Sequence, residues 1–116
     1  MKVVQAPLGG GVVGVTVEGR LDAATVPTLE QTLQRLLFDG QARLVVDLEA
    51  VNYISSSGLR ALLTARRQAR TRGGDVFLCS LHPHVREIFE MVGFVSVFGI
   101  YASRDEAAAA FRSSAT

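Results

Sequence analysis

The sequence predicts an α/β fold in which about four helices pack on one mixed, mostly parallel β-sheet. Three observations support this expectation. Short β-branched runs alternate with stretches whose apolar residues recur every three or four positions. Glycines mark many of the breaks between these segments. The first two strands follow each other directly, and helices separate the later strands, so the expected order is β-β-α-β-α-β-α-β-α.

The N-terminal third of the chain predicts a β-hairpin and then an amphipathic helix. Residues 2–6 and the valine-rich run 12–17 flank three consecutive glycines, which is typical of a hairpin. Apolar residues then recur at helical spacing over 26–37, and polar residues occupy the other face. Either Asp22 or Thr25 can cap the start of this helix.

The remainder of the chain predicts alternating strands and helices. In chain order we expect a strand at 44–48, a helix at 58–72, a strand at 75–80, a helix around 85–92 and a short strand at 97–101. The first of these strands is a continuous apolar run, as in strands covered on both faces. Ser103, followed three residues later by Glu106, has the capping-box pattern and predicts a final helix through Phe111.

Length and charge exclude several classes of function. A chain of 116 residues fits one domain, and its formal net charge of +1 gives no field for nucleic acid or for a membrane surface. No apolar run approaches the roughly 20 residues needed to cross a bilayer, and no signal peptide is evident. Cys79 lies in an apolar run and suits a buried thiol. We therefore expect a cytoplasmic protein.

Three motifs suggest chemistry that their context does not support. Residues 9–14 match G-x-G-x-x-G, but a strand follows instead of the helix that a dinucleotide site needs. His82 and His84 lack a cysteine or carboxylate at metal-ligand spacing. Asp47 and Glu49 end a strand without an accompanying histidine or lysine, so Asp47 is interpreted as tying down a loop. No metal or cofactor is predicted.

The informative feature is the segment Ser55-Ser56-Ser57-Gly58, which we call the serine turn. A strand ends before it and a helix begins there. One serine as the helix cap and a closely packed Gly58 explain part of this pattern, but not three hydroxyls. A hydrolase elbow, G-x-S-x-G, is absent, and no motif places a histidine to activate a serine. An exposed serine at a helix start suits a phosphate group, because the helix dipole favours negative charge there.

Three segments of the chain resemble the STAS family, and specifically its anti-sigma factor antagonists. They are the run 44–59 with its strand, loop and serine turn, the sequence Gly-Arg-Leu-Asp at 19–22, and Phe98-Gly99-Ile100-Tyr101 with Ser103 and Glu106 after it. Their order matches that of the predicted elements. The resemblance covers nearly the whole chain and implies a STAS-like domain at 1–112 with a short tail at 113–116.

The resemblance implies a regulator of transcription, such as a stress response, and not an enzyme. In this family the unphosphorylated domain binds an anti-sigma factor that is also a serine kinase, and binding frees the sigma factor. Phosphorylation of the antagonist separates the complex, and a phosphatase resets it. The acceptor lies two places before the glycine, which is Ser56 here. Ser57 is the alternative, because Ser55 stands where the family usually has an acidic residue.

We expect a partner-binding surface made of Asp22, Ser55, Ser56, Ser57, Gly58 and Arg60, and no metal, nucleic acid or membrane is predicted to bind there. Helical spacing places the five arginines of the 60–72 helix outward, where they meet either an acidic partner or solvent. Two alternatives stay open. One is a non-phosphorylated STAS scaffold subunit of a transporter or stress-signalling complex. The other is a small serine hydrolase acting through Ser56. The oligomeric state is left open.

Overall fold

The computed structural model describes residues 2–113, and the elements of that part follow the predicted order. The strands are β1 (Lys2–Gly9), β2 (Val12–Glu18), β3 (Arg43–Ala50), β4 (Asp75–Cys79) and β5 (Ile100–Tyr101). The helices are α1 (Val26–Phe38), α2 (Ser56–Thr71), α3 (Pro83–Met91) and α4 (Arg104–Ser113), and a 3-10 helix, η1, spans Phe94–Ser96. Ser113 ends α4, and the rest of the expected tail lies outside the described residues.

The strands form one mixed sheet in the order β1-β2-β3-β4-β5. The hairpin strands β1 and β2 are antiparallel, and every later neighbour pairs in parallel, as the sequence predicted. The register of β1 against β2 shifts between Pro7 and Gly9, next to the glycine turn. The long strand β1 forms one lateral edge of the sheet, and the two-residue strand β5 forms the other.

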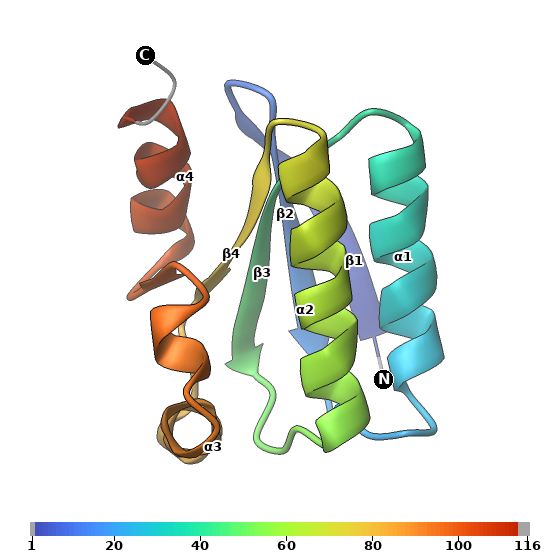
Figure 1. The fold of residues 1–116 in the computed structure, drawn as a ribbon, viewed down its shortest axis with the longest axis vertical. Coiled ribbons are helices and arrows are strands. Elements are labelled where there is room, and N and C mark those ends of the chain that lie inside the picture. Colours follow the sequence, from blue (N-terminus) through green and yellow to red (C-terminus); the bar gives the residue numbers. More distant parts are fainter. Residues whose placement is uncertain (1, 114–116) are drawn as a thin grey trace.

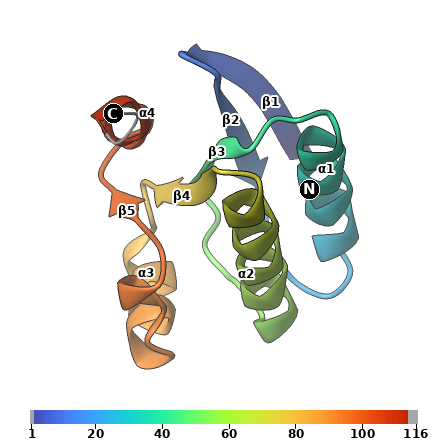
Figure 2. The same cartoon turned by 45° about the horizontal axis from the view of Figure 1, so that its top comes forward.

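The helices cover the two faces of the sheet unequally (Figures 1 and 2). Helices α1, α2 and α3 share one face, and α4 lies on the other. Alternate residues of β3 point into the two layers, since Leu44 and Val46 belong to the larger core and Val45 to the smaller. Leu29 and Leu62, both fully buried, bring α1 and α2 onto the larger core.

Helix α4 is fastened to its face by one aromatic and one ionic contact. The Phe111 ring stacks on Phe77 with their centroids 4.0 Å apart. At the other end of the helix, Arg104 Nε lies 3.2 Å from Asp47 Oδ2. The same Asp47 carboxylate accepts the backbone N–H of Glu49 through Oδ1 at 3.0 Å. Asp47, which is buried, therefore fixes both the end of β3 and the start of α4.

Several element boundaries differ from the sequence-based expectation by one to three residues, and β1, for example, runs to Gly9 and not to residue 6. Helix α2 begins at Ser56 and not at Gly58, because Ser55 takes the extended N-cap conformation. The last strand is shorter than the predicted 97–101, since only Ile100 and Tyr101 pair with β4. Before it the backbone closes a turn, in which the N–H groups of Val97 and Phe98 both donate to the carbonyl of Phe94.

A substitution of Phe111 tests how much α4 depends on its buried ring. We expect Phe111→Ala to lower the free energy of unfolding by about 3 kcal/mol, because it empties a packed site between α4 and the sheet. Phe38→Ala is the matched control, as that ring is 85% exposed, and its effect should stay within about 0.5 kcal/mol. Urea unfolding measures both, and equal losses would contradict this account.

Candidate functional site

The serine turn lies where the chain leaves the central strand β3 and enters α2. Residues 51–54 connect the two, with Val51 and Ile54 buried beneath the surface. Because β2, β3 and β4 run parallel, their carboxyl ends meet at one edge of the sheet. The first turn of α2 therefore lies at the same end of the sheet as the last residues of β2.

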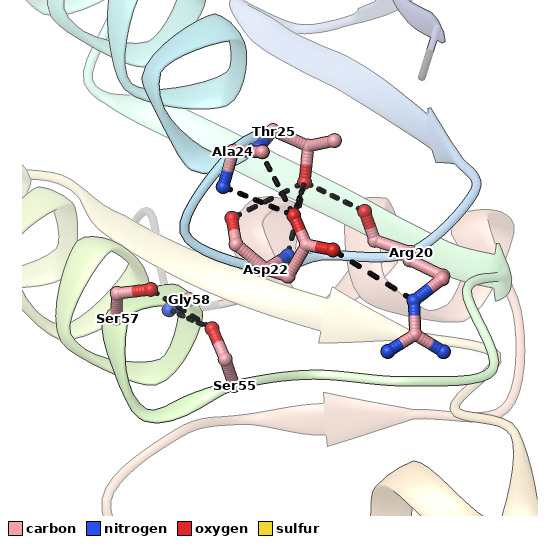
Figure 3. Close-up of polar contacts among 7 residues, drawn as sticks. All are labelled: Arg20, Asp22, Ala24, Thr25, Ser55, Ser57 and Gly58. Atoms are coloured by element: carbon pink, nitrogen blue, oxygen red, sulfur yellow. Dashed lines mark hydrogen bonds and ion pairs between the residues drawn. The ribbon is translucent and has the colours of Figure 1, made fainter.

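A short backbone pairing joins the exit from β2 to the serine turn. Leu21 and Ile54 form an isolated parallel bridge. The N–H of Leu21 donates to the carbonyl of Tyr53 at 2.9 Å, and the N–H of Ser55 donates to the carbonyl of Leu21 at 2.8 Å. Asp22, the next residue along, therefore lies beside the serine turn (Figure 3), where the family resemblance implies it should be.

Gly58 is required by the close approach of α2 to this pairing. A Cβ atom at Gly58 would lie 2.9 Å from Cγ1 of Ile54, which is closer than such atoms pack, and 3.1 Å from Cγ of Leu21, which is tighter than most such contacts. The missing side chain therefore lets the first turn of α2 press directly onto the Leu21–Ile54 bridge. Its role is packing, as the sequence suggested.

The three serines of the turn have different environments. Ser55 Oγ accepts the N–H of Gly58 at 3.3 Å, which caps α2, and it also hydrogen-bonds Ser57 Oγ at 2.8 Å (Figure 3). Ser57 is half-buried by this arrangement. Ser56 is exposed at the first position of α2, and its hydroxyl makes no hydrogen bond to any residue between 2 and 113. The structure thus separates one free hydroxyl from two that hold the turn.

Asp22 closes the turn that leads into α1. Its Oδ1 accepts the N–H groups of Ala24 and Thr25, and its own N–H donates to Thr25 Oγ1 at 2.9 Å (Figure 3). The Thr25 hydroxyl in turn donates to the carbonyl of Arg20 at 2.6 Å. Thr25 occupies the N-cap position of α1, but its side chain does not cap the helix. Of the two capping candidates, Asp22 supplies the carboxylate that orders this turn.

The pKa of the Asp22 carboxyl lies below its ordinary value. Desolvation acts to raise this pKa, but the hydrogen bonds from Thr25 and Ala24 and the nearby Arg20 charge together outweigh it. Arg20 Nε lies 3.7 Å from Asp22 Oδ2. Its guanidinium also covers the Tyr53 ring, 4.1 Å from the centroid. Sequence reasoning missed Arg20 and Tyr53, because their contact joins two segments far apart in the chain.

The arginines of α2 do not all point outward. Arg60 and Arg67 are exposed, and Arg60 lies one helical turn after Ser56 on the same side of α2. Arg66, by contrast, is only 21% exposed at its side chain, with its Nε 3.4 Å from Asp75 Oδ1. The expectation of five outward arginines is therefore wrong for Arg66, which turns toward the first residue of β4.

The motifs interpreted as structural have ordinary structural surroundings. Of the G-x-G-x-x-G match, Gly9 ends β1, Gly10 and Gly11 form the hairpin turn, and Gly14 lies within β2. His82 caps α3, where its Nδ1 accepts the N–H of His84. Burial raises the pKa of the Cys79 thiol to about 11. Over residues 2–113, no cluster of metal-ligating side chains is present and no helix is long and apolar enough to span a membrane.

The surroundings of Ser56 differ from those of a catalytic serine. Within the described chain, no base is hydrogen-bonded to the exposed Ser56 hydroxyl, and the neighbouring hydroxyls serve the backbone. The described residues therefore give the Ser56 hydroxyl no hydrogen-bonded general base. The serine turn and Asp22 lie side by side at the surface of this α/β domain.

Comparison with known proteins identifies the family. The STAS domain family matches residues 4–107, and the chain belongs to it. BtrV of Bordetella bronchiseptica, assigned as an anti-sigma factor antagonist, is 40% identical over 97% of this chain and 96% of its own. The structure of an anti-sigma factor antagonist from Mycobacterium paratuberculosis has a TM-score of 0.86 and 29% identity, and it covers 96% of this chain and 93% of its own.

The structural likeness extends to SpoIIAA, an anti-sigma factor antagonist, in its unphosphorylated form. That structure has a TM-score of 0.83 and 21% identity, and it covers 99% of this chain and all of its own, so it bears on the fold alone. The sequence relatives place the chain among the anti-sigma factor antagonists, which are non-enzymatic regulators.

A substitution at Gly58 tests the close packing beneath the serine turn. We expect Gly58→Ala to destabilise the fold by about 1–3 kcal/mol, since the added methyl must displace Leu21 or Ile54. Thr64→Ala, at an exposed position of α2, is the control and should change stability by no more than about 0.5 kcal/mol. Thermal unfolding compares the two. A Gly58→Ala variant as stable as the control would contradict the packing argument.

The lowered pKa of Asp22 predicts a specific dependence of stability on pH. In the unfolded chain the pKa of Asp22 is near its ordinary value of 3.8, and in the folded protein it is lower. The ionised carboxyl therefore stabilises the fold fully at pH values above the unfolded pKa. This contribution is lost as the pH falls through the folded pKa. Relative to Asp22→Asn, the wild type should therefore lose stability progressively in this acid range. Denaturant unfolding at a series of pH values measures the difference. A constant difference across the series would contradict the assignment.

Proposed function

We propose that this protein binds an anti-sigma factor that is also a serine kinase, and that phosphorylation of Ser56 ends the complex. In the unphosphorylated state, binding frees the sigma factor for transcription. Transfer of phosphate to Ser56 by the kinase separates the two proteins, and a phosphatase restores the first state. The family relatives named as anti-sigma factor antagonists support the identity of the partner. Such a cycle belongs in the cytoplasm, where sigma factors act.

The observation that carries the choice of acceptor is the environment of the three serines. A kinase needs a hydroxyl that can leave its own protein and enter another active site. Ser56 is exposed and free of hydrogen bonds to the described residues, whereas Ser55 and Ser57 bond to each other. Modification at Ser57 would break that bond and uncover a half-buried position. The geometry therefore favours Ser56 over the alternative Ser57.

The start of α2 can carry a phosphate without loss of the fold. A phosphate adds a charge of about −1.5 to −2, and the first turn of a helix favours negative charge. The cap of α2 is the Ser55 hydroxyl, which phosphorylation of Ser56 leaves in place. We therefore expect the modified protein to stay folded, so that the charge acts on the partner and not on the domain.

The proposed docking surface consists of the serine turn, Asp22 and Arg60. Asp22 is held in place by the Leu21–Ser55 hydrogen bond, and Arg60 follows Ser56 by one helical turn. A phosphate on Ser56 would stand between these groups and alter both the fit and the charge of the surface. Mismatched charge at an interface costs several kcal/mol, enough to separate a complex of ordinary affinity.

The test is phosphorylation by the cognate kinase with ATP, followed by mass spectrometry of the serine turn. We expect one phosphate on Ser56 in the wild type, none in Ser56→Ala, and unchanged modification in Ser57→Ala. Ser56→Asp should also weaken binding to the anti-sigma factor by about tenfold or more, because it places a permanent charge at the contact.

The control for the binding measurement is Thr64→Asp, which adds the same charge at an exposed position further along α2. Its affinity should stay within about twofold of the wild type, since rim charges contribute little. Phosphate found on Ser57 instead of Ser56 would overturn the choice of acceptor. Absence of phosphate from residues 55–57 would overturn the switch itself.

A further inference from the structure

A group of arginines lies at the end of the molecule opposite the serine turn. The amino ends of β3 and β4, the β1–β2 turn and the carboxyl ends of α1, α2 and α4 meet there (Figure 1). We call this region the arginine end and define it by Arg43, Arg70, Arg72 and Arg112. Nothing in the proposed phosphorylation cycle uses it.

Two adjoining hollows mark the arginine end. One has a volume of about 340 Å³ and the other about 290 Å³, and they share Arg43, Gly73 and Gly74 in their walls. Arg72 lines the first hollow and Arg70 the second. The half-buried Arg43 therefore stands between two concave spaces, each with a second arginine at its side.

Positive charge at this end is only partly neutralised. Asp75 Oδ2 accepts from Arg70 Nη1 at 3.1 Å, and its other oxygen faces Arg66. Arg72 Nη1 donates to the carbonyl of Gln68 at 3.2 Å, on its own helix. The side chains of Arg43 and Arg112, however, make no hydrogen bond or ion pair with any residue in the described part of the chain.

Stabilisation of helix ends accounts for the positions of Arg70, Arg72 and Arg112, but not for that of Arg43. A basic side chain near a helix carboxyl end satisfies free carbonyls, and the Arg72–Gln68 contact is of that kind. Arg43, in contrast, begins a strand. It lies opposite Asp75 in the sheet register, yet the two make no ion pair, since Asp75 is taken by Arg66 and Arg70. The Arg43 guanidinium, without an acceptor among the described residues, is therefore available to the carboxylate of a ligand.

The floor and rim of the hollows suit a polypeptide. A Cβ atom placed on Gly11, Gly40 or Gly73 would meet nothing within 4 Å, so another chain can approach the backbone here. Beside Gly40, at the end of α1, the Phe38 ring is 85% exposed. Exposed aromatic rings and arginines together are the residues enriched at protein interfaces.

The helix dipoles at this end disfavour a multiply charged phosphate more strongly than single carboxylates. Three helices end here, and their carboxyl ends carry partial negative charge that opposes a compact, multiply charged phosphate. Carboxylates spaced along a peptide can instead pair singly with separated guanidinium groups, while an apolar side chain covers Phe38. The chemistry of the arginine end therefore favours an acidic segment.

We propose that the arginine end binds an acidic segment of a partner protein that carries an apolar residue among its carboxylates. The carboxylates pair with Arg43, Arg72 and Arg112, and the apolar residue packs on Phe38. Because this surface and the serine turn lie at opposite ends of the sheet, one molecule can hold both partners at once (Figure 1). Binding at the arginine end is then independent of the state of Ser56.

The test uses fluorescence anisotropy with a labelled peptide of Asp and Glu around one central Leu. We expect the double variant Arg43→Glu/Arg72→Glu to bind at least about tenfold more weakly than the wild type, because two attractive contacts become repulsive. Arg67→Glu/Arg86→Glu changes the same net charge at exposed positions outside both proposed surfaces and should stay within about twofold. Phe38→Ala should weaken binding about threefold or more without any change in charge, and Ser56→Asp should have no effect.

Circular dichroism first establishes that each variant is folded. If the double variant is not folded, amide chemical shifts of the wild-type protein replace it, and we expect the peptide to shift Arg43, Gly73 and Gly74 and to leave Ser56 unmoved. Equal weakening by the two double variants would overturn the proposal, as would equal binding of the Asn and Gln form of the peptide. Displacement of the peptide by inorganic phosphate at lower concentration would also overturn it, in favour of a phosphate site.

Discussion

The pairing of Leu21 with Ile54 is the contact on which the functional surface depends. Two hydrogen bonds and one bridge extend the parallel register of β2 and β3 beyond the regular strands. This extension brings two loops, separated by a helix and a strand in sequence, to a common edge. Gly58 then allows α2 to pack directly above the bridge. Without this pairing, Asp22 and the serine turn would belong to two unconnected loops, and no shared surface would exist.

The cap of α2 is neutral, and this affects its neighbour. A carboxylate at position 55 would cap the helix equally well but would place a negative charge directly beside the Ser56 hydroxyl. A hydroxyl at Ser55 satisfies Gly58 N–H and still binds Ser57. The first turn of α2 is therefore ordered through uncharged groups, and the free hydroxyl of Ser56 projects from a rigid frame. The nearest charged side chains on this surface belong to Asp22 and Arg60, so the proposed recognition rests on shape and on these two charges.

Much of the fold was predictable because β-branched runs and helical spacing are local signals. The element order, the mixed sheet and the serine turn at a helix start all follow from such patterns. Contacts between distant segments were not predictable in the same way. The shortened last strand reflects the packing of Phe94 and Phe98 around Phe89, and the inward turn of Arg66 reflects Asp75 on the next strand. The Arg20–Tyr53 stacking likewise exists only once the two loops have met.

The free edge of β1 has a consequence for how the molecule meets other chains. An unpaired strand of this length is a template for sheet extension and hence for aggregation. Pro7 has no backbone N–H to offer, and the register shift beside it bends the strand near the hairpin. A second strand therefore cannot add along the full edge of β1. The two proposed binding surfaces accordingly lie at the ends of the sheet and use side chains, not the backbone edge of β1.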